Sequence, residues 1–334
     1  MEGLKKINFK KYSLLKGDAS FRKFYRKKNK KSSSIIVFAK KEKKKNLLDY
    51  ASVNKLLLNH KISVPNLISE NYKKNIIEIE DIGKTTLYSE LKKGNKKKII
   101  NKLLKELIKN KNIKINKIKN FQNKFYKIKK YSNKILLDEA KLFLNWYLPE
   151  YYKGKKAKYI KNIFIKIFKK MCAQLKNNNK TFVHRDFHVS NIMLHKKKLY
   201  IIDSQDALFG NIAYDLASLI DDVRLETTKN FKKKVYDKYF SLNKKKINKK
   251  NFKSDFIILS ILRNFKIIGI FKRLHKRDKK QKYLKLIRLP LSLIQSYQLP
   301  ILLPRLMMKD SILLMQPIAM VSPIFTHLVL VFSA

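Results

Sequence analysis

The feature that most constrains the fold is a set of polar residues at fixed spacing in the middle of the chain. In the stretch VHRDFHVSNIM, residues 183–193, Asp186 is followed five positions later by Asn191. Two short strand-like pieces, NIML and LYIID, then lead to Asp203, 17 residues after Asp186. The sequence therefore predicts that Asn191 and Asp203 face one site from either side of a short hairpin.

These residue types suit phosphoryl transfer. That reaction needs a carboxylate that accepts the proton of the attacking hydroxyl, and oxygen ligands for a Mg²⁺ ion that bridges the nucleotide phosphates. We expect Asp186 to be the catalytic base, and Asn191 and Asp203 to be the metal ligands. The alternative is a set of ordinary loop-capping residues, because Asp and Asn are common in turns. The joint spacing favours the catalytic interpretation.

Two other readings of the same loop are weaker. The chain has no G-x-G-x-x-G loop and no A-P-E after Asp203, which argues against a protein kinase. His184 and His188 are four residues apart, as in zinc sites of the H-E-x-x-H type, but Arg185 stands where that motif has Glu and no third ligand is evident. We expect His184 to brace the loop by hydrogen bonds.

The periodicity of apolar residues predicts an α+β fold with a small strand-rich lobe, residues 1–82, and a larger, mainly helical lobe, residues 83–290. In the first lobe we expect strands at 19–27, 33–40 and 76–80 and a helix at 46–60. In the second we expect helical structure from about 85 to 178, then the polar loop and its hairpin, then helices at 213–223, 228–241 and 254–275.

The loop form H-x-D-hydrophobic-H-x-x-N resembles that of the aminoglycoside phosphotransferase and choline kinase superfamily, with His188 as the distinguishing residue. Within it the chain is most similar to the anomeric N-acetylmuramate/N-acetylglucosamine kinases of bacterial cell-wall recycling. The passages that carry the likeness are 17–26, 183–193, 201–224 and 262–284. The resemblance implies a bilobal protein-kinase-like fold that transfers phosphate from ATP, with Mg²⁺, to the anomeric hydroxyl of an N-acetylated sugar.

The resemblance also implies roles for residues outside the loop. Gly17, Ala19 and Ser20 stand where a loop covers the nucleotide phosphates, and Gln205 and Asp206 stand where sugar contacts are expected. We expect further contacts on the sugar side from Arg224, Arg263 and Asn264, although a surface ion pair would explain each Arg almost as well. Asp215, near a helix start, is expected to be structural, as are the two loop histidines.

Two positions depart from the family pattern. Lys40, at the end of SIIVFAK, is in the right kind of strand to bind phosphates, with Glu42 or Asp49 as its partner, but other lysines crowd it. Ser204 follows the metal Asp where such kinases usually carry a large apolar residue, which predicts looser packing around Asp203 and a weaker metal site.

The net charge of +55 does not by itself identify a partner. Nine of the 79 basic residues are Arg, so 79 − 9 = 70 are Lys, spread along the chain together with many Ile and Asn. This indicates an A/T-rich gene and a solvated Lys surface rather than a specific nucleic-acid interface. The alternatives that stay open are a kinase of another acceptor, such as choline or an aminoglycoside, and an inactive kinase-like protein that binds nucleic acid.

The single cysteine and the two ends of the sequence give further expectations. The single cysteine, Cys172, excludes an intrachain disulfide, and the N-terminus has no apolar run of signal-peptide length, so we expect a cytoplasmic protein. Residues 291–334 differ from the rest, with two basic residues, no Asn and four of the seven Met. This tail is either a hydrophobic membrane or partner segment or, the interpretation we prefer, the product of a frame slip in the gene.

Overall fold

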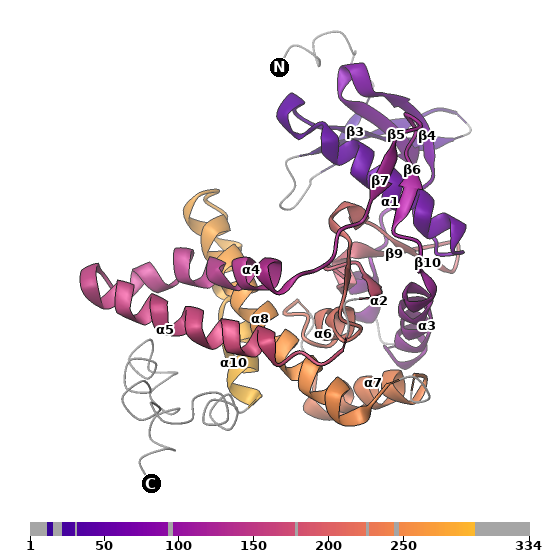
Figure 1. Ribbon diagram of the computed structural model, residues 1–334. Helices are drawn as coiled ribbons and strands as arrows, with labels where there is room; N and C mark the ends of the chain where they lie inside the picture. Colours follow the sequence, from indigo (N-terminus) through magenta and orange to yellow (C-terminus); the bar gives the residue numbers. More distant parts are fainter. Residues whose placement is uncertain are drawn as a thin grey trace. The chain divides into compact units, whose positions relative to one another are not determined.

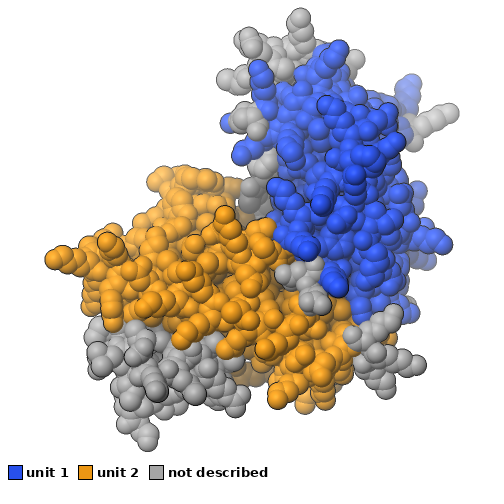
Figure 2. All heavy atoms as spheres, in the orientation of Figure 1, with its two compact units in different colours: residues 1–130, 180–209 blue, residues 131–179, 210–334 orange. Residues whose placement is uncertain are grey.

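The computed structural model describes residues 12–15, 22–30, 32–92, 96–177, 180–224, 227–243 and 247–297. The chain forms two compact units, each built from two separate stretches (Figure 2). The first comprises residues 1–130 and 180–209, and the second comprises residues 131–179 and 210–334. The lobe boundaries predicted after residues 82 and 290 stay predictions, and most of the atypical tail, residues 298–334, lies outside the described residues.

The first unit contains a five-stranded antiparallel sheet with the strand order β1-β2-β3-β5-β4 (Figure 1). Its strands are β1 (Ser13–Leu15), β2 (Lys23–Lys28), β3 (Ser33–Phe38), β4 (Leu67–Asn71) and β5 (Ile76–Glu80). The strand predicted at 76–80 is confirmed. The strands predicted at 19–27 and 33–40 correspond to β2 and β3, of which β3 ends two residues earlier than predicted.

Helix α1 (Lys45–Asn59) covers one face of this sheet and confirms the helix predicted at 46–60. Leu47 and Tyr50 of the helix form a buried cluster with Ile35, Val37 and Ile77 of the central strands. Burial of such apolar side chains is the main stabilising term for this layer, about 1.5–3 kcal/mol for each large aliphatic residue. The central strands therefore fix the position of α1.

The rest of the first unit consists of short elements. They are α2 (Leu87–Lys92), α3 (Lys96–Lys109), β6 (Lys117–Lys119), β7 (Phe125–Lys127), β8 (Thr181–Val183), β9 (Ile192–His195), β10 (Lys198–Ile201) and β11 (Leu208–Gly210). The antiparallel pair of β9 and β10 confirms the hairpin predicted between Asn191 and Asp203.

The expectation of helical structure throughout 85–178 is wrong at β6 and β7, which form an antiparallel hairpin. The turn between them is held by the Asn120 side chain, whose Oδ1 accepts hydrogen bonds from the backbone N–H of Gln122 at 2.9 Å and of Lys124 at 3.0 Å. Asn123 adopts a left-handed conformation with φ 59°. Asn tolerates both roles, so local turn chemistry overrides the helical pattern here.

The second unit is helical in its described residues. Its helices are α4 (Asn133–Trp146), α5 (Gly154–Ala173), α6 (Tyr214–Ile220), α7 (Lys229–Ser241), α8 (Lys249–Lys276), α9 (Lys282–Leu286) and α10 (Arg288–Ser296). Ser132, Thr228 and Asn248 cap the N-termini of α4, α7 and α8 with side-chain hydrogen bonds. These helices confirm the α+β class and the three helices predicted after the polar loop.

Helix α8 is the core of this unit. Phe265 packs on Phe143, Phe164 and Phe168, with ring centroids 4.9 to 5.8 Å apart. Gly269 lets α8 approach α4 closely, since a Cβ there would lie 2.2 Å from the backbone of Leu142.

Two further observations concern the helices. Cys172 on α5 is buried, and burial raises the pKa of its thiol to about 11. Among the described residues, none of the helices combines the length and the apolar character needed to cross a bilayer.

Candidate active site

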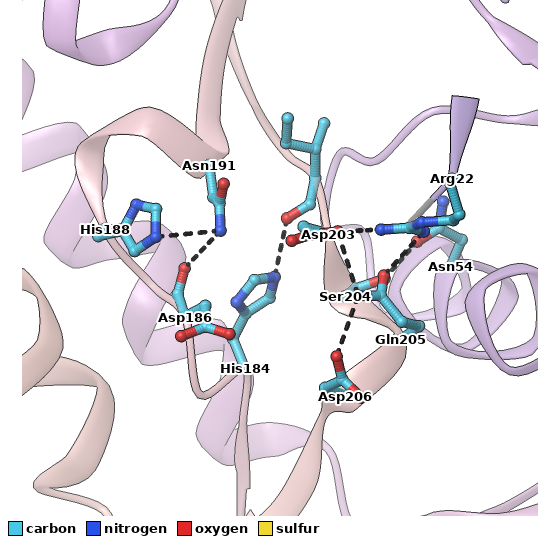
Figure 3. A network of polar contacts seen from close by, with 11 residues as sticks. Arg22, Asn54, His184, Asp186, His188, Asn191, Asp203, Ser204, Gln205 and Asp206 are labelled. Carbon is cyan, nitrogen blue, oxygen red and sulfur yellow. Dashed lines mark hydrogen bonds and ion pairs between the residues drawn. The ribbon is translucent and has the colours of Figure 1, made fainter. Parts of the chain in front are cut away.

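The loop after β8 forms a tight turn around Asp186. The Asn191 Nδ2 group donates a hydrogen bond to the backbone oxygen of Asp186 at 3.1 Å and another to His188 Nε2 at 3.3 Å. The backbone N–H of His188 donates to the same backbone oxygen of Asp186 at 3.0 Å. Because the amide nitrogen of Asn191 makes both side-chain contacts, its amide oxygen points away from Asp186 (Figure 3). That oxygen is the atom a metal ion would use.

His184 links this turn to the segment that carries Asp203. Its ring is buried, and Nε2 donates to the backbone oxygen of Ile202 at 3.0 Å, which fixes the hydrogen on Nε2 (Figure 3). Burial lowers the pKa of His184, against the opposing charges of Asp186 and Asp203. This hydrogen bond is of the kind expected of a bracing residue, and the structural role of His184 stays a prediction.

Asp203 follows β10 and adopts a left-handed conformation with φ 66°, which Asp tolerates better than most residues. Its Oδ1 accepts hydrogen bonds from the Arg22 guanidinium and from Gln205 Nε2, the latter at 3.1 Å. About 39 % of the Asp203 side chain is exposed. The first unit thus contains Asp186, Asn191 and Asp203 in two loops that His184 ties together.

Ser204 does not leave a gap beside Asp203. It is fully buried, and its hydroxyl donates to Asn54 Oδ1 on α1 at 2.6 Å. Gln205 is also buried; its Oε1 accepts from Arg22 at 3.1 Å, and its Nε2 also donates to Asp206 Oδ2 at 3.1 Å. Hydrogen bonds of Ser204 to α1 and of Gln205 to Arg22 therefore hold this segment, where related kinases usually have a large apolar residue after the Asp.

A pocket of about 440 Å³ adjoins the same loops within the first unit. Its walls come from the start of α1, the β6–β7 hairpin, the loop after β8 and the segment after Asp203. The charged residues in its lining are Lys45, Lys124, Lys127, Lys129 and Arg185 against Asp49 and Asp206, a formal sum of 5 − 2 = +3. The pocket is therefore electropositive.

Arg185 is unusual in this lining. It has φ 74°, a conformation that costs a non-glycine residue of the order of 1 kcal/mol, and its Nη1 donates to the backbone oxygen of Asp206 at 3.0 Å. The guanidinium thus holds the segment after Asp203 against the catalytic turn. Arg185, Asn54 and Arg22 were not selected from the sequence, because their partners lie 21, 150 and 181 residues away along the chain.

Lys40 lies just beyond β3, at the start of a 3₁₀ turn (Lys41–Lys43), and is exposed. Among the described residues its side chain makes no hydrogen bond or ion pair. Asp49 pairs with Lys45, at 2.9 and 3.0 Å, and not with Lys40. The side chain of Glu42, and the whole of Gly17, Ala19 and Ser20, fall outside the described residues.

The remaining predicted residues belong to the second unit. Arg224 pairs with Asp222 at 3.2 Å, and Asp215 is buried in the first turn of α6. Arg263 and Asn264 are buried on α8, where Asn264 donates to the backbone oxygen of Ser260 at 2.8 Å. Their predicted roles remain predictions. In the part of the chain that the structure describes, no cluster of three His, Cys, Asp or Glu side chains could hold a metal ion.

Comparison with known proteins decides the family. The model of the phosphotransferase enzyme family, named APH, matches residues 11–244. The chain belongs to this family. As a family member it is a phosphotransferase with a kinase-like α+β fold, and the resemblance inferred from the loop residues is confirmed.

Three relatives illustrate the likeness of this phosphotransferase. The N-acetylmuramate/N-acetylglucosamine kinase of Neisseria meningitidis serogroup B is 26 % identical over 271 residues, 80 % of this chain and 79 % of the relative. The kinase of the same name from Pseudomonas aeruginosa is 24 % identical over 280 residues, 80 % and 78 % of the two chains. A crystal structure of the aminoglycoside phosphotransferase APH(2'')-Ib with ADP bound has a TM-score of 0.57 at 16 % identity, covering 88 % of this chain and 95 % of the other.

Proposed function

We propose that this phosphotransferase is an ATP- and Mg²⁺-dependent sugar kinase that phosphorylates the anomeric hydroxyl of N-acetylmuramate or N-acetylglucosamine, as a step of cell-wall recycling. The observation that carries the proposal is the pair of hydrogen-bonded loops with Asp186, Asn191 and Asp203. The names of the two bacterial relatives support the choice of acceptor.

In this proposal Asp186 is the catalytic base. It accepts the proton of the acceptor hydroxyl as that oxygen forms a bond to the γ-phosphorus of ATP. The bond from the γ-phosphorus to the β–γ bridging oxygen breaks, and ADP leaves with the electron pair. A positioned base typically contributes about 10²–10⁴-fold to the rate, and the Asn191 and His188 contacts hold the backbone of Asp186 in place.

The residues present fit a magnesium ion. Mg²⁺ prefers oxygen ligands, and the Asn191 amide oxygen and the partly exposed Asp203 carboxylate are both of this kind. A Mg²⁺ ion held by these two residues would supply positive charge that neutralises part of the charge of the nucleotide phosphates. The protein's own contribution is to aim the two ligands, through Asn191 Nδ2 on one side and through Arg22 and Gln205 on the other.

The electropositive pocket bears on the acceptor. Its net charge of +3 beside the catalytic turn repels cationic acceptors such as choline or an aminoglycoside. N-acetylglucosamine is neutral, and the lactyl group of N-acetylmuramate is anionic. The charge therefore supports an N-acetylated sugar over the cationic alternatives.

The test is an ADP-release assay of the purified chain with Mg²⁺ and ATP. The acceptors are N-acetylmuramate, N-acetylglucosamine, choline and kanamycin, with the methyl glycoside of N-acetylglucosamine as the matched control that has no free anomeric hydroxyl. We expect turnover with the two free sugars alone, and a phosphorus NMR signal from a sugar 1-phosphate. Turnover of the methyl glycoside would refute the anomeric assignment, and turnover of only choline or kanamycin would refute the sugar assignment.

A further inference from the structure

The structure contains an arginine whose position sets it apart from the Lys-rich surface. Arg22 is about 5 % exposed, and its guanidinium lies over the rings of Phe24 at 5.4 Å and Tyr50 at 5.5 Å. Nη1 donates to Gln205 at 3.1 Å, and Nη2 pairs with Asp203. Two aromatic rings and two polar partners, one of them 181 residues away, hold this cation in one place.

A second buried arginine on the same sheet provides the comparison. Arg26 pairs with Asp81 at 2.6 and 2.9 Å and also donates to the backbone oxygen of Gly83. Both partners of that pair are buried, with side-chain exposures of 6 % and 7 %. Arg22 is as buried as Arg26, but Asp203, its partner, is 39 % exposed. The Arg26 pair is closed in the protein interior, whereas the Arg22 pair opens to solvent on the carboxylate side.

The exposed side of Asp203 is where phosphate would come within reach of Arg22. Mg²⁺ binds oxygen at about 2.0–2.1 Å, so a phosphate oxygen that shares the ion with Asp203 lies at most about 4 Å from that carboxylate. A guanidinium already hydrogen-bonded to the same carboxylate is therefore a neighbour of those phosphates. The planar fork of Arg suits phosphate oxygens better than the ammonium of Lys.

Lys40 has none of these supports. It is exposed, follows the strand rather than lying within it, and has Lys41, Lys43 and Lys44 beside it. Helix α1 also offers it no carboxylate, because Asp49 pairs with Lys45, and the helix presents Tyr50 and Asn54 to the Asp203 segment instead.

We infer that Arg22, and not Lys40, is the cation that binds the phosphates of the nucleotide, acting from the start of β2 while it also orients Asp203. This inference rests on the proposed function, since it assigns a role within the same ATP site. It moves the phosphate-binding cation from a position just after β3 to the residue that immediately precedes β2.

The experiment measures binding rather than turnover. The dissociation constants of MgATP and of adenosine, which lacks phosphate, are determined by calorimetry for the wild type, Arg22→Met, Arg22→Lys and Lys40→Met. Lys27→Met is the matched control, since Lys27 is a cation on β2 whose partner is Glu78, at 3.1 Å. Loss of a charged hydrogen-bond donor predicts an MgATP constant about 10- to 100-fold higher in Arg22→Met.

We expect the adenosine constant to change by less than about twofold in Arg22→Met, and both constants to stay unchanged in Lys40→Met and Lys27→Met. Arg22→Lys keeps the charge without the fork and should lie between wild type and Arg22→Met; it also provides the test if Arg22→Met does not fold. An equal loss of MgATP and adenosine affinity in the Arg22 variants, or a selective loss of MgATP in Lys40→Met, would overturn the inference.

The same data separate this inference from the proposed function. Suppose that the wild type binds MgATP, that Arg22→Met selectively loses this binding, and that no sugar is phosphorylated. This result would refute the proposed sugar acceptor and would support the role of Arg22. Wild-type protein that binds no MgATP would refute both.

Discussion

Two aspartates show how the two units use the same chemical group differently. Asp255, in α8 of the second unit, is fully buried and accepts four hydrogen bonds, from the backbone N–H of Lys176 and Asn177 and from the side-chain amides of Asn177 and Asn211. Asp203, in the first unit, uses Oδ1 for Arg22 and Gln205 and remains partly exposed. A carboxylate saturated by the protein holds the structure together, and one left partly exposed can take a ligand.

The largest effect is expected from an Asp-to-Asn substitution at a third aspartate, Asp186, whose carboxylate we propose to take part in the reaction. Asp186→Asn removes the carboxylate that we propose as the base but keeps the size of the side chain and the backbone contacts of the turn. We expect kcat to fall by about 10²–10⁴-fold while the MgATP dissociation constant stays within about twofold. An ADP-release assay measures kcat, and calorimetry on the same preparation measures the MgATP dissociation constant. Turnover like that of the wild type would remove Asp186 from the role of base.

The same substitution separates Asp255 from Asp203. In Asp255→Asn an amide NH₂ group replaces one of the carboxylate oxygens and faces N–H donors that are left without an acceptor. We therefore expect the free energy of unfolding to fall by about 3 kcal/mol. In Asp203→Asn the amide oxygen can still accept from Arg22, so we expect a loss of at most about 1 kcal/mol. Urea denaturation measures both losses.

The activity of these two variants should show the opposite order. We expect Asp203→Asn to need at least about tenfold more Mg²⁺ for half-maximal turnover, because the substitution removes the charge of the proposed metal ligand. Asp255→Asn, assayed at a temperature where it is folded, should keep the wild-type Mg²⁺ requirement. Variants with the same Mg²⁺ requirement would contradict the division of labour between the two carboxylates.

A smaller effect is expected where the second unit depends on close packing alone. A methyl group at Gly269 meets the backbone of Leu142, which cannot rotate away, so Gly269→Ala should cost about 2 kcal/mol of unfolding free energy. Gly154→Ala is the matched control, because a Cβ added there would meet no neighbouring side chain or backbone within 4 Å. Only the positive φ of 53° opposes this substitution, and we expect it to lower the free energy of unfolding by about 1 kcal/mol. A smaller loss at Gly269 than at Gly154 would argue against the close approach of α4 and α8.

The smallest effect concerns His184, the buried brace of the catalytic loop. Burial lowers its pKa, so the unfolded chain binds more protons than the folded chain as the pH falls below the ordinary value of about 6.5. Stability should therefore decrease with falling pH, by at most about 1.4 kcal/mol per pH unit from this group. His184→Gln, which can still donate to Ile202, should give a flatter curve between pH 7 and 5. Parallel curves for the two proteins would exclude a contribution from His184.

The parts of the fold that rest on local patterns could be predicted from the sequence. The amphipathic pattern of 46–60 and the apolar strand at 76–80 specify α1 and β5, and the Asp186 spacing identifies the hairpin between Asn191 and Asp203. The β6–β7 hairpin was missed because its strands are three residues long, Lys-Ile-Lys and Phe-Tyr-Lys, too short to show a period of two. The two Asn residues of its turn were the available signal.

The polar network around Asp203 could not be predicted, because its partners are distant in the sequence. Nothing local pairs Arg22 with Asp203, or Asn54 with Ser204, 150 residues apart. Those contacts follow from the tertiary position of α1 and β2. The scarcity of Arg in a Lys-rich chain was the one hint that residues such as Arg22 have a special role.

The burial of Cys172 has a practical consequence for spectroscopy. A thiol whose pKa is raised to about 11 holds almost no thiolate at neutral pH, and maleimide or iodoacetamide reagents attack the thiolate. Since Cys172 is the only cysteine, a new thiol at exposed Gln122, in the turn between β6 and β7, can be labelled selectively without a cysteine-free background. A fluorophore there lies in the turn between Asn120 and Lys124, which both line the electropositive pocket, and would test whether a ligand added to the protein changes the surroundings of that pocket.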